Sequence, residues 1–235
     1  MVASARVLTI PEVHNLPLFR GVSPAEVQRV RSLARRERVA VGAWLFEQGQ
    51  PASALFLLDS GRVRVTQSGP GGQQVVLHLV SPGEAFGCSA ILHERQYPGS
   101  AEVVAEAVVE RFDAAALRVL EREVPQVAAN ALGLLAARVR DLRVRYREAV
   151  TQRVEPRIAS TLVRLVQQTG VVEAGGGTRI GLRLSRQDLA ELAGTTMFTV
   201  SRTLTSWEQL GLVEVARQRV TVCDVERLTA LAEAG

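Results

Sequence analysis

The spacing of hydrophobic positions changes twice along the chain. Residues 15–38 begin with a turn and then carry a helical start signal: Ser23 as N-cap, Pro24 at the first helical position and Glu26 three residues beyond the cap. Residues 39–113 instead form short β-type runs that are separated by glycines at regular intervals. This pattern predicts a short amphipathic helix followed by an antiparallel barrel or sandwich.

After Asp113 the helical period returns, with a narrow apolar stripe whose steps alternate between three and four residues. Such a stripe, flanked by charges, is the seam of a two-stranded coiled coil and predicts a homodimer. The alternative is that the stripe packs on the chain's own barrel, and we expect the upper part of the helix to do so. The predicted dimer contacts are Leu132, Leu135, Val139, Leu142 and Tyr146.

The most informative stretch follows residue 184. Ser185 with Asp188 predicts a capped helix, Gly194 ends it, and a second helix is expected over residues 196–210. Two short helices joined by so tight a turn indicate a helix-turn-helix. The next residues alternate as a two-stranded wing with residues 217–219 at its tip, which indicates a winged helix.

The outer face of the second predicted helix combines apolar and polar side chains suited to DNA. Arg202 can reach the O6/N7 edge of a guanine, and Met197 and Phe198 can contact thymine methyl groups in the major groove. Hydroxyl side chains and the helix N-terminus can contact phosphates. The alternative is that Met197 or Phe198 folds back against the wing or the first helix as core.

Charge and cysteine content narrow the function only slightly. The 28 basic residues are all arginine and exceed the 24 acidic ones, a net charge of +4 that permits binding to a polyanion. No run approaches about 18 apolar residues and no signal peptide is recognisable, so we expect a cytoplasmic protein without a membrane partner. The two cysteines, Cys88 and Cys223, lack metal-ligand spacing and suggest buried thiols in a reducing compartment, with a redox-sensing Cys88 as the alternative.

Several stretches together resemble the Crp/Fnr family of bacterial transcription regulators. LSRQDLAELAGTTMFTVSRTLTSWEQLGLV is similar to the family's DNA-binding signature, and GRVRV, SPGEAFG and GSAEV are similar to its β-roll landmarks. The resemblance implies an α+β fold with a cyclic-nucleotide-binding-like β-roll at residues 1–120. A dimerisation helix and hinge at 121–152 and a winged helix-turn-helix at 153–235 follow.

At the DNA-reading end, the family's phosphate-contacting residues fall on Arg186 and Thr196, and its recognition arginine falls on Arg202. The family's recognition glutamate would fall on Phe198, so an acceptor for cytosine is replaced by a hydrocarbon ring. We therefore expect a half-site with a guanine and a thymine-containing step. The predicted DNA contacts are Arg186, Thr196, Met197, Phe198, Thr199, Ser201, Arg202, Arg217 and Arg219.

The predicted sensory domain departs further from the family pattern. In cyclic-nucleotide-binding members a glutamate binds the ribose and an arginine binds the phosphate, and these positions hold Cys88 and Gly99. An internal anion without a cationic partner is costly, so we expect no cyclic AMP binding. The candidate effector pocket consists of Gly83, Glu84, Cys88 and Ser100.

The family also includes sensors that use an iron–sulfur cluster or haem, and the sequence bears on both cofactors. The N-terminus lacks the cysteine group of the iron–sulfur members, so no such cluster is expected. The TT-hydrophobe-hydrophobe-TVSR pattern resembles regulators that respond to nitric oxide, some through haem. Of the three histidines, His14 and His93 are the better haem candidates and His78 the weaker.

The sequence therefore predicts a homodimeric regulator that binds near-palindromic double-stranded DNA and is modulated by an effector at the β-roll. RNA polymerase is an expected partner. The alternative is a cyclic-nucleotide-type regulatory or scaffolding module whose C-terminal domain binds protein. No constellation of catalytic residues is recognisable, so an enzyme is not expected.

Overall fold

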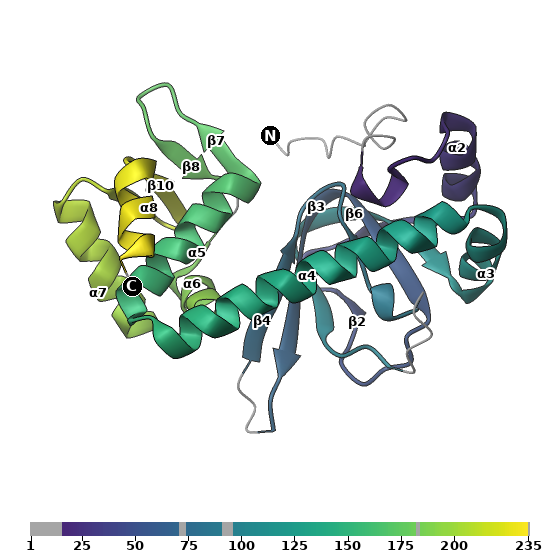
Figure 1. Ribbon diagram of the computed structural model, residues 1–235, viewed down its shortest axis with the longest axis horizontal. Helices are drawn as coiled ribbons and strands as arrows, with labels where there is room; N and C mark the ends of the chain where they lie inside the picture. The colour runs from purple at the N-terminus through teal and green to yellow at the C-terminus, as the bar shows by residue number, and fades with distance from the viewer. Residues whose placement is uncertain (1–15, 71–73, 91–95, 182–183, 235) are drawn as a thin grey trace. The chain divides into compact units, whose positions relative to one another are not determined.

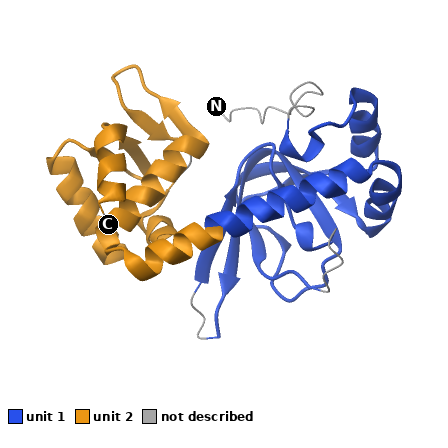
Figure 2. Cartoon of the chain, viewed as in Figure 1, with its two compact units in different colours: residues 1–141 blue, residues 142–235 orange. Residues whose placement is uncertain are grey.

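The computed structural model describes residues 16–70, 74–90, 96–181 and 184–234. The chain divides into two compact units, residues 1–141 and 142–235, coloured separately in Figure 2. The division falls inside one long helix, α4 (Pro125–Thr151), rather than at the helix end near residue 152. The predicted haem ligands His14 and His93 lie outside the described residues.

The first unit is built around an antiparallel sheet with the order β1-β6-β3-β4, in which β2 pairs with β6 and β5 pairs with β3 (Figure 1). Its elements are η1 (Pro17–Phe19), α2 (Pro24–Ser32), β1 (Arg35–Val39), β2 (Trp44–Phe46), β3 (Ala54–Ser68), β4 (Gln74–Val80), β5 (Ala85–Phe86), η2 (Cys88–Ala90), β6 (Ser100–Asp113) and α3 (Ala114–Glu123). The sheet closes into the β-roll that the sequence predicted.

Strand β3 separates two hydrophobic cores because its side chains alternate between faces. Leu55 and Leu57 pack with α2, α3 and the start of α4, whereas Phe56 and Leu58 pack with the aromatic interior of the roll. Gly61, further along the same strand, has φ at +91°, and a Cβ there would come within 2.2 Å of the Glu106 carbonyl oxygen. The close approach of β3 and β6 therefore requires glycine at this position.

The upper part of α4 packs on its own β-roll. Val127 and Ala131 are fully buried in the core beneath α2, and Leu135 is partly buried against the same core. The side-chain amide of Asn130 donates to the carbonyls of Leu18 (2.9 Å) and Arg20 (2.8 Å). Leu135, which we predicted as a dimer contact, is thus at least partly covered by its own chain.

The second unit is a winged helix-turn-helix with more regular structure than the sequence indicated. It contains α5 (Val154–Thr169), β7 (Gly170–Val172), β8 (Thr178–Ile180), α6 (Arg186–Ala193), α7 (Met197–Gln209), β9 (Val213–Ala216), β10 (Arg219–Val222) and α8 (Val225–Glu233). The predicted two-stranded wing, β9 and β10, is the outer half of a four-stranded sheet with the order β7-β8-β10-β9. Helix α8 and the pairing of β7 were not predicted.

Candidate nucleic-acid interface

The turn between α6 and α7 has the local geometry that its residues dictate. Ser185 and Asp188 form a capping box at the start of α6, and Gly194 ends that helix in the left-handed conformation with φ at +62°. Thr196 caps α7 by accepting from the Thr199 amide at 3.2 Å. The two threonine hydroxyls lie 2.9 Å apart, so Thr199 can donate to Thr196 and leave the Thr196 hydroxyl proton for an outside acceptor.

Arg157 on α5 holds this turn in place, a role that the sequence did not reveal. Its guanidinium donates to the carbonyls of Ala193 (3.2 Å) and Gly194 (3.0 Å) at the end of α6. It also donates to Gln152 (3.1 Å) and Ala149 (3.4 Å) at the end of α4. One cation thus satisfies carbonyls at two helix C-termini, where positive charge is favoured.

The inner face of α7 is fixed by buried side chains. Val200, Leu204 and Trp207 are buried, as the helical spacing predicted for the first two. The indole Nε1 of Trp207 donates to the Glu155 carboxylate at 3.0 Å. This bond satisfies a buried donor and fixes the rotation of α7 about its own axis relative to α5.

Because the inner face is fixed, the opposite face of α7 lies open to solvent. Met197 is 53% exposed and Phe198 is 75% exposed, and Arg202 is also exposed. The alternative that Phe198 packs in the core is therefore wrong. Ser201 and Thr199 are half-buried beside them.

Arginines surround this exposed face. Arg186 begins α6, while Arg217 and Arg219 flank the turn of the wing, and all three are exposed. Among the described residues no acidic side chain forms an ion pair with these three arginines or with Arg202. Their charges are available to an outside anion such as a DNA phosphate.

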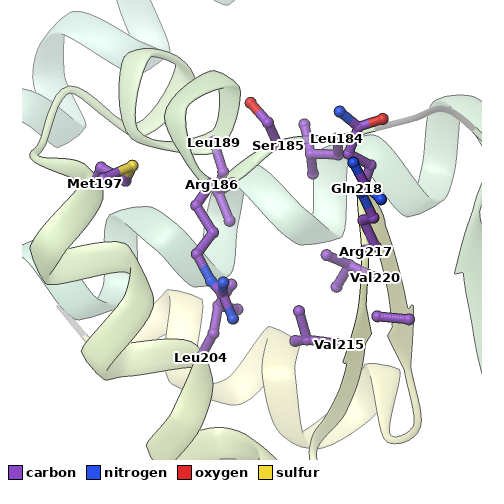
Figure 3. A pocket seen from close by; sticks show the side chains of 11 residues that line it. Leu184, Ser185, Arg186, Leu189, Met197, Leu204, Val215, Arg217, Gln218 and Val220 are labelled. Atoms are coloured by element: carbon purple, nitrogen blue, oxygen red, sulfur yellow. The ribbon is translucent and has the colours of Figure 1, made fainter.

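The wing turn also borders an open cavity. Gln218 has φ at +56°, and its carbonyl accepts from the Leu184 amide at 3.1 Å, which ties the wing tip to the start of α6. Between α6, α7 and the wing lies a cavity of about 470 Å³ (Figure 3). The side chain of Arg186 extends across it toward Leu204.

In the β-roll, the predicted effector residue Glu84 is part of a polar network. Its carboxylate lies 3.0 Å from His78 Nε2 and accepts from the Ser81 amide at 2.7 Å. Burial alone would raise the pKa of Glu84, but these partners and the Arg138 guanidinium lower it below its usual value. Arg62 donates to the Ser81 hydroxyl at 2.5 Å, so two arginines that were not predicted for the effector pocket, Arg62 and Arg138, belong to this site.

The other predicted effector residues have separate surroundings. Cys88 is buried in η2, and burial raises the pKa of its thiol despite the nearby Arg138 charge. The Ser100 hydroxyl accepts from the Gln48 amide at 2.9 Å. Gly83 occupies a turn with φ at +88°. Within the described residues, no hydrogen bond joins Ser100 to Gly83, Glu84 or Cys88.

The predicted dimer seam is exposed along most of α4. Four large apolar side chains of the predicted seam are exposed: Leu132, Val139, Leu142 and Tyr146.

No helix in the described part of the chain is long and apolar enough to cross a membrane.

Comparison with known proteins agrees with this architecture. Residues 156–231 match the Crp-like helix-turn-helix domain, and residues 36–123 match the cyclic nucleotide-binding domain. Among solved structures, the c-di-GMP responsive regulator CLP of Xanthomonas campestris has a TM-score of 0.76 at 21% identity and covers 86% of this chain and 100% of its own. That likeness supports the fold.

Two curated relatives cover nearly the whole chain. The Cyclic AMP receptor protein of Thermus thermophilus is 33% identical over 216 residues, which is 92% of this chain and 96% of the relative. A CRP-like cAMP-activated global transcriptional regulator of Mycobacterium tuberculosis is 26% identical over 211 residues, 90% of this chain and 94% of its own. The chain therefore belongs to the Crp/Fnr family and is a helix-turn-helix transcription regulator with a cyclic-nucleotide-binding-like sensor domain.

Proposed function

We propose that this regulator acts as a homodimer whose two α7 helices enter successive major grooves of a near-palindromic site. The observation that carries the proposal is the exposed face of α7, where Met197, Phe198 and Arg202 stand beside arginines that have no ion-pair partner within the described part of the chain. In dimers of this type, half-sites lie about 34–36 Å apart, one turn of DNA. RNA polymerase is a further proposed partner.

Arg202 is the proposed reader of a guanine, and its replacement is the direct test. We expect Arg202→Ala to weaken binding to the selected site by about 1–3 kcal/mol for each half-site, or about 5- to 160-fold, because a bidentate contact to O6 and N7 is lost. Sequences selected from random DNA are expected to lose the guanine preference at one position of each half-site. Arg227 is an exposed arginine on α8, so Arg227→Ala is the matched control. It should leave the DNA affinity and the guanine preference unchanged. Retained guanine preference in Arg202→Ala would contradict this assignment.

Phe198 is the proposed partner of a thymine methyl group. We expect Phe198→Ala to reduce the preference for thymine at one step by about 1 kcal/mol, or about fivefold, and to leave the guanine preference intact. Selection of bound sequences from random DNA with wild type and variant measures this. The proposal fails when both proteins select the same half-site.

Salt dependence separates DNA binding from the scaffolding alternative, which none of the comparisons supports. Each phosphate contact from Arg186, Arg217 or Arg219 releases counterions, so affinity should fall steeply with salt concentration. An interaction with a protein partner through apolar contacts would lack this steep slope.

For the sensor, we propose an effector other than cyclic AMP. A Cβ at Gly99 would lie 2.5 Å from the Thr66 carbonyl oxygen, so the backbone here excludes the arginine that would bind the phosphate. Buried Cys88 offers a weak donor where the family has a carboxylate. The names of the two relatives favour the opposite view, and calorimetric titration decides: saturable micromolar binding of cyclic AMP would overturn the proposal.

Haem is a separate effector candidate that depends on His14 and His93. His78, the histidine within the described residues, is engaged by Glu84 and is a poor ligand. An anaerobic haem titration followed by nitric oxide, with spectra and DNA binding recorded on the same samples, tests this. Stoichiometric binding that disappears in His14→Ala or His93→Ala supports haem, and unsaturable binding excludes it.

A further inference from the structure

We propose that the cavity between α6, α7 and the wing binds an aliphatic carboxylate of medium chain length, and that the bound ligand competes with DNA. The site lies in the DNA-reading unit and is distinct from the β-roll sensor. Its existence does not depend on the proposed base contacts. The competition does rest on the proposed function, because it requires Arg186 and Arg217 to contact DNA phosphates.

The cavity has the size and walls of a small-molecule site. Its volume of about 470 Å³ falls within the range of about 300–1,000 Å³ that such sites occupy. Four of the lining residues are aliphatic and almost fully buried: Leu184, Leu189, Leu204 and Val220. Met197 and Val215 extend this apolar lining toward the solvent.

The shape of the lining selects an aliphatic ligand tail. No aromatic side chain is among the described lining residues, so a flat ring would find no stacking partner. A flexible hydrocarbon chain can instead follow the branched side chains, and the methionine can adapt to it. DNA cannot occupy this apolar interior, because its backbone presents charged phosphates and hydrated sugars.

The rim of the cavity selects an anionic head group. Arg186 and Arg217 both line the cavity, and Figure 3 shows Arg186 extending from α6 toward Leu204 and Arg217 on the opposite side, on the wing near Gln218. Neither guanidinium has an ion-pair partner among the described residues. A carboxylate matches the planar fork of arginine in bidentate geometry, whereas an uncharged head group would leave both cations unpaired.

Arg186 and Arg217 are also proposed phosphate contacts, so a ligand bound to them should affect DNA binding. A carboxylate bound by either arginine neutralises charge that would otherwise contact phosphates. A tail beside Met197 also reaches the exposed face of α7. Ligand and DNA therefore cannot both use Arg186 and Arg217 fully, and occupancy of the cavity should weaken DNA binding.

The first experiment measures the site without DNA. Full-length protein is titrated with the fluorescent fatty acid 11-(dansylamino)undecanoic acid, and the probe is then displaced with unlabelled decanoate. We expect saturable binding of one probe per chain and an affinity that falls about fourfold for each methylene removed from the competitor. Decanol, which lacks the charge, should compete at least about tenfold less well. Absence of saturable binding would overturn the proposal.

Variants locate the ligand within the protein. Val215→Phe fills the cavity from the wing, and Arg217→Ala removes a cation from the exposed tip, where folding is not at risk. We expect each to weaken probe binding at least about tenfold. Val172→Phe, on the exposed strand β7, is the matched control and should bind as the wild type does. Unchanged binding in both cavity variants would place the probe elsewhere and refute the site.

DNA competition is read separately. Saturating decanoate should raise the apparent Kd for DNA in wild type, and the increase should be lost in Val215→Phe. If Val215→Phe weakens decanoate binding but decanoate leaves the DNA affinity of wild type unchanged, the site is supported and the proposed competition with DNA is wrong. Absence of DNA binding both with and without a β-roll effector would instead contradict the proposed function, and the probe titration would still decide the site.

Discussion

A Val139→Glu/Leu142→Glu variant is expected to be monomeric and to bind the near-palindromic site about 10²- to 10⁴-fold more weakly than wild type. Both side chains are large, apolar and nearly half exposed, at 47% and 42%. In a two-fold symmetric dimer each substitution faces its own copy across the axis, so four carboxylates would meet in an apolar seam. Loss of the dimer removes the second recognition helix, and with it the gain from binding two half-sites at once.

Position along the helix provides the control for this variant. Val144 is also exposed, but it lies on the opposite side of the heptad from Leu142 and Tyr146. Val144→Glu should therefore leave the dimer and the DNA affinity unchanged. Light scattering gives the oligomeric state, and fluorescence anisotropy with full sites and single half-sites gives the affinities. A double variant that stays dimeric would show that the subunits associate through another surface.

Local signals explain why much of the fold was predictable. The two capping boxes, at Ser23 with Glu26 and at Ser185 with Asp188, involve residues three apart and were predicted correctly because no distant contact is needed. The change from β-type to helical spacing likewise marks the end of the roll. Strand β7 was missed because three residues are too few to show a period, and its pairing with β8 stabilises it. Helix α8 was missed although Asp224 caps it and its apolar residues have helical spacing, so its local signal was available.

Long-range contacts explain what the sequence could not give at the site. Arg157 satisfies carbonyls at two helix ends, and no spacing identifies an arginine whose partners are backbone oxygens of other helices. The network of His78, Glu84, Arg62 and Arg138 joins residues from different elements in the same way. The exposure of Phe198 depends on the burial of Trp207, which fixes the rotation of α7.

The second large effect is expected at the buried ion cluster that joins α2 to the β-roll. Arg31 Nε donates to the Glu110 carboxylate at 2.7 Å, and its Nη2 lies 3.5 Å from Asp59. Arg36 pairs with Asp59 at 2.7 Å from the other side. Asp59 is fully buried, so Arg31→Met would leave carboxylate charge poorly compensated in the interior. We expect the variant to lose about 3–5 kcal/mol of unfolding free energy at neutral pH.

A matched control is available on the same helix. Arg29 pairs with Glu123, but its side chain is 60% exposed, so Arg29→Met should cost no more than about 1 kcal/mol. Urea unfolding of the full chain, followed by Trp44 fluorescence in a common Trp207→Phe background, reports on this unit. Equal costs for the two variants would mean that the buried cluster contributes no more than a surface pair.

The pH dependence of the Arg31→Met effect identifies its cause. Burial raises the pKa of Asp59, and the Glu110 charge adds to this, while Arg31 and Arg36 oppose it. Since the folded chain then holds a proton more tightly than the unfolded chain, stability from Asp59 is greatest below its ordinary pKa and falls as pH rises through the raised value. Removing Arg31 raises the pKa of Asp59 further, so the difference in unfolding free energy between Arg31→Met and wild type should shrink as the pH falls from neutrality toward the ordinary pKa of an aspartate, about 4. A cost that is independent of pH would instead indicate lost packing of the arginine side chain.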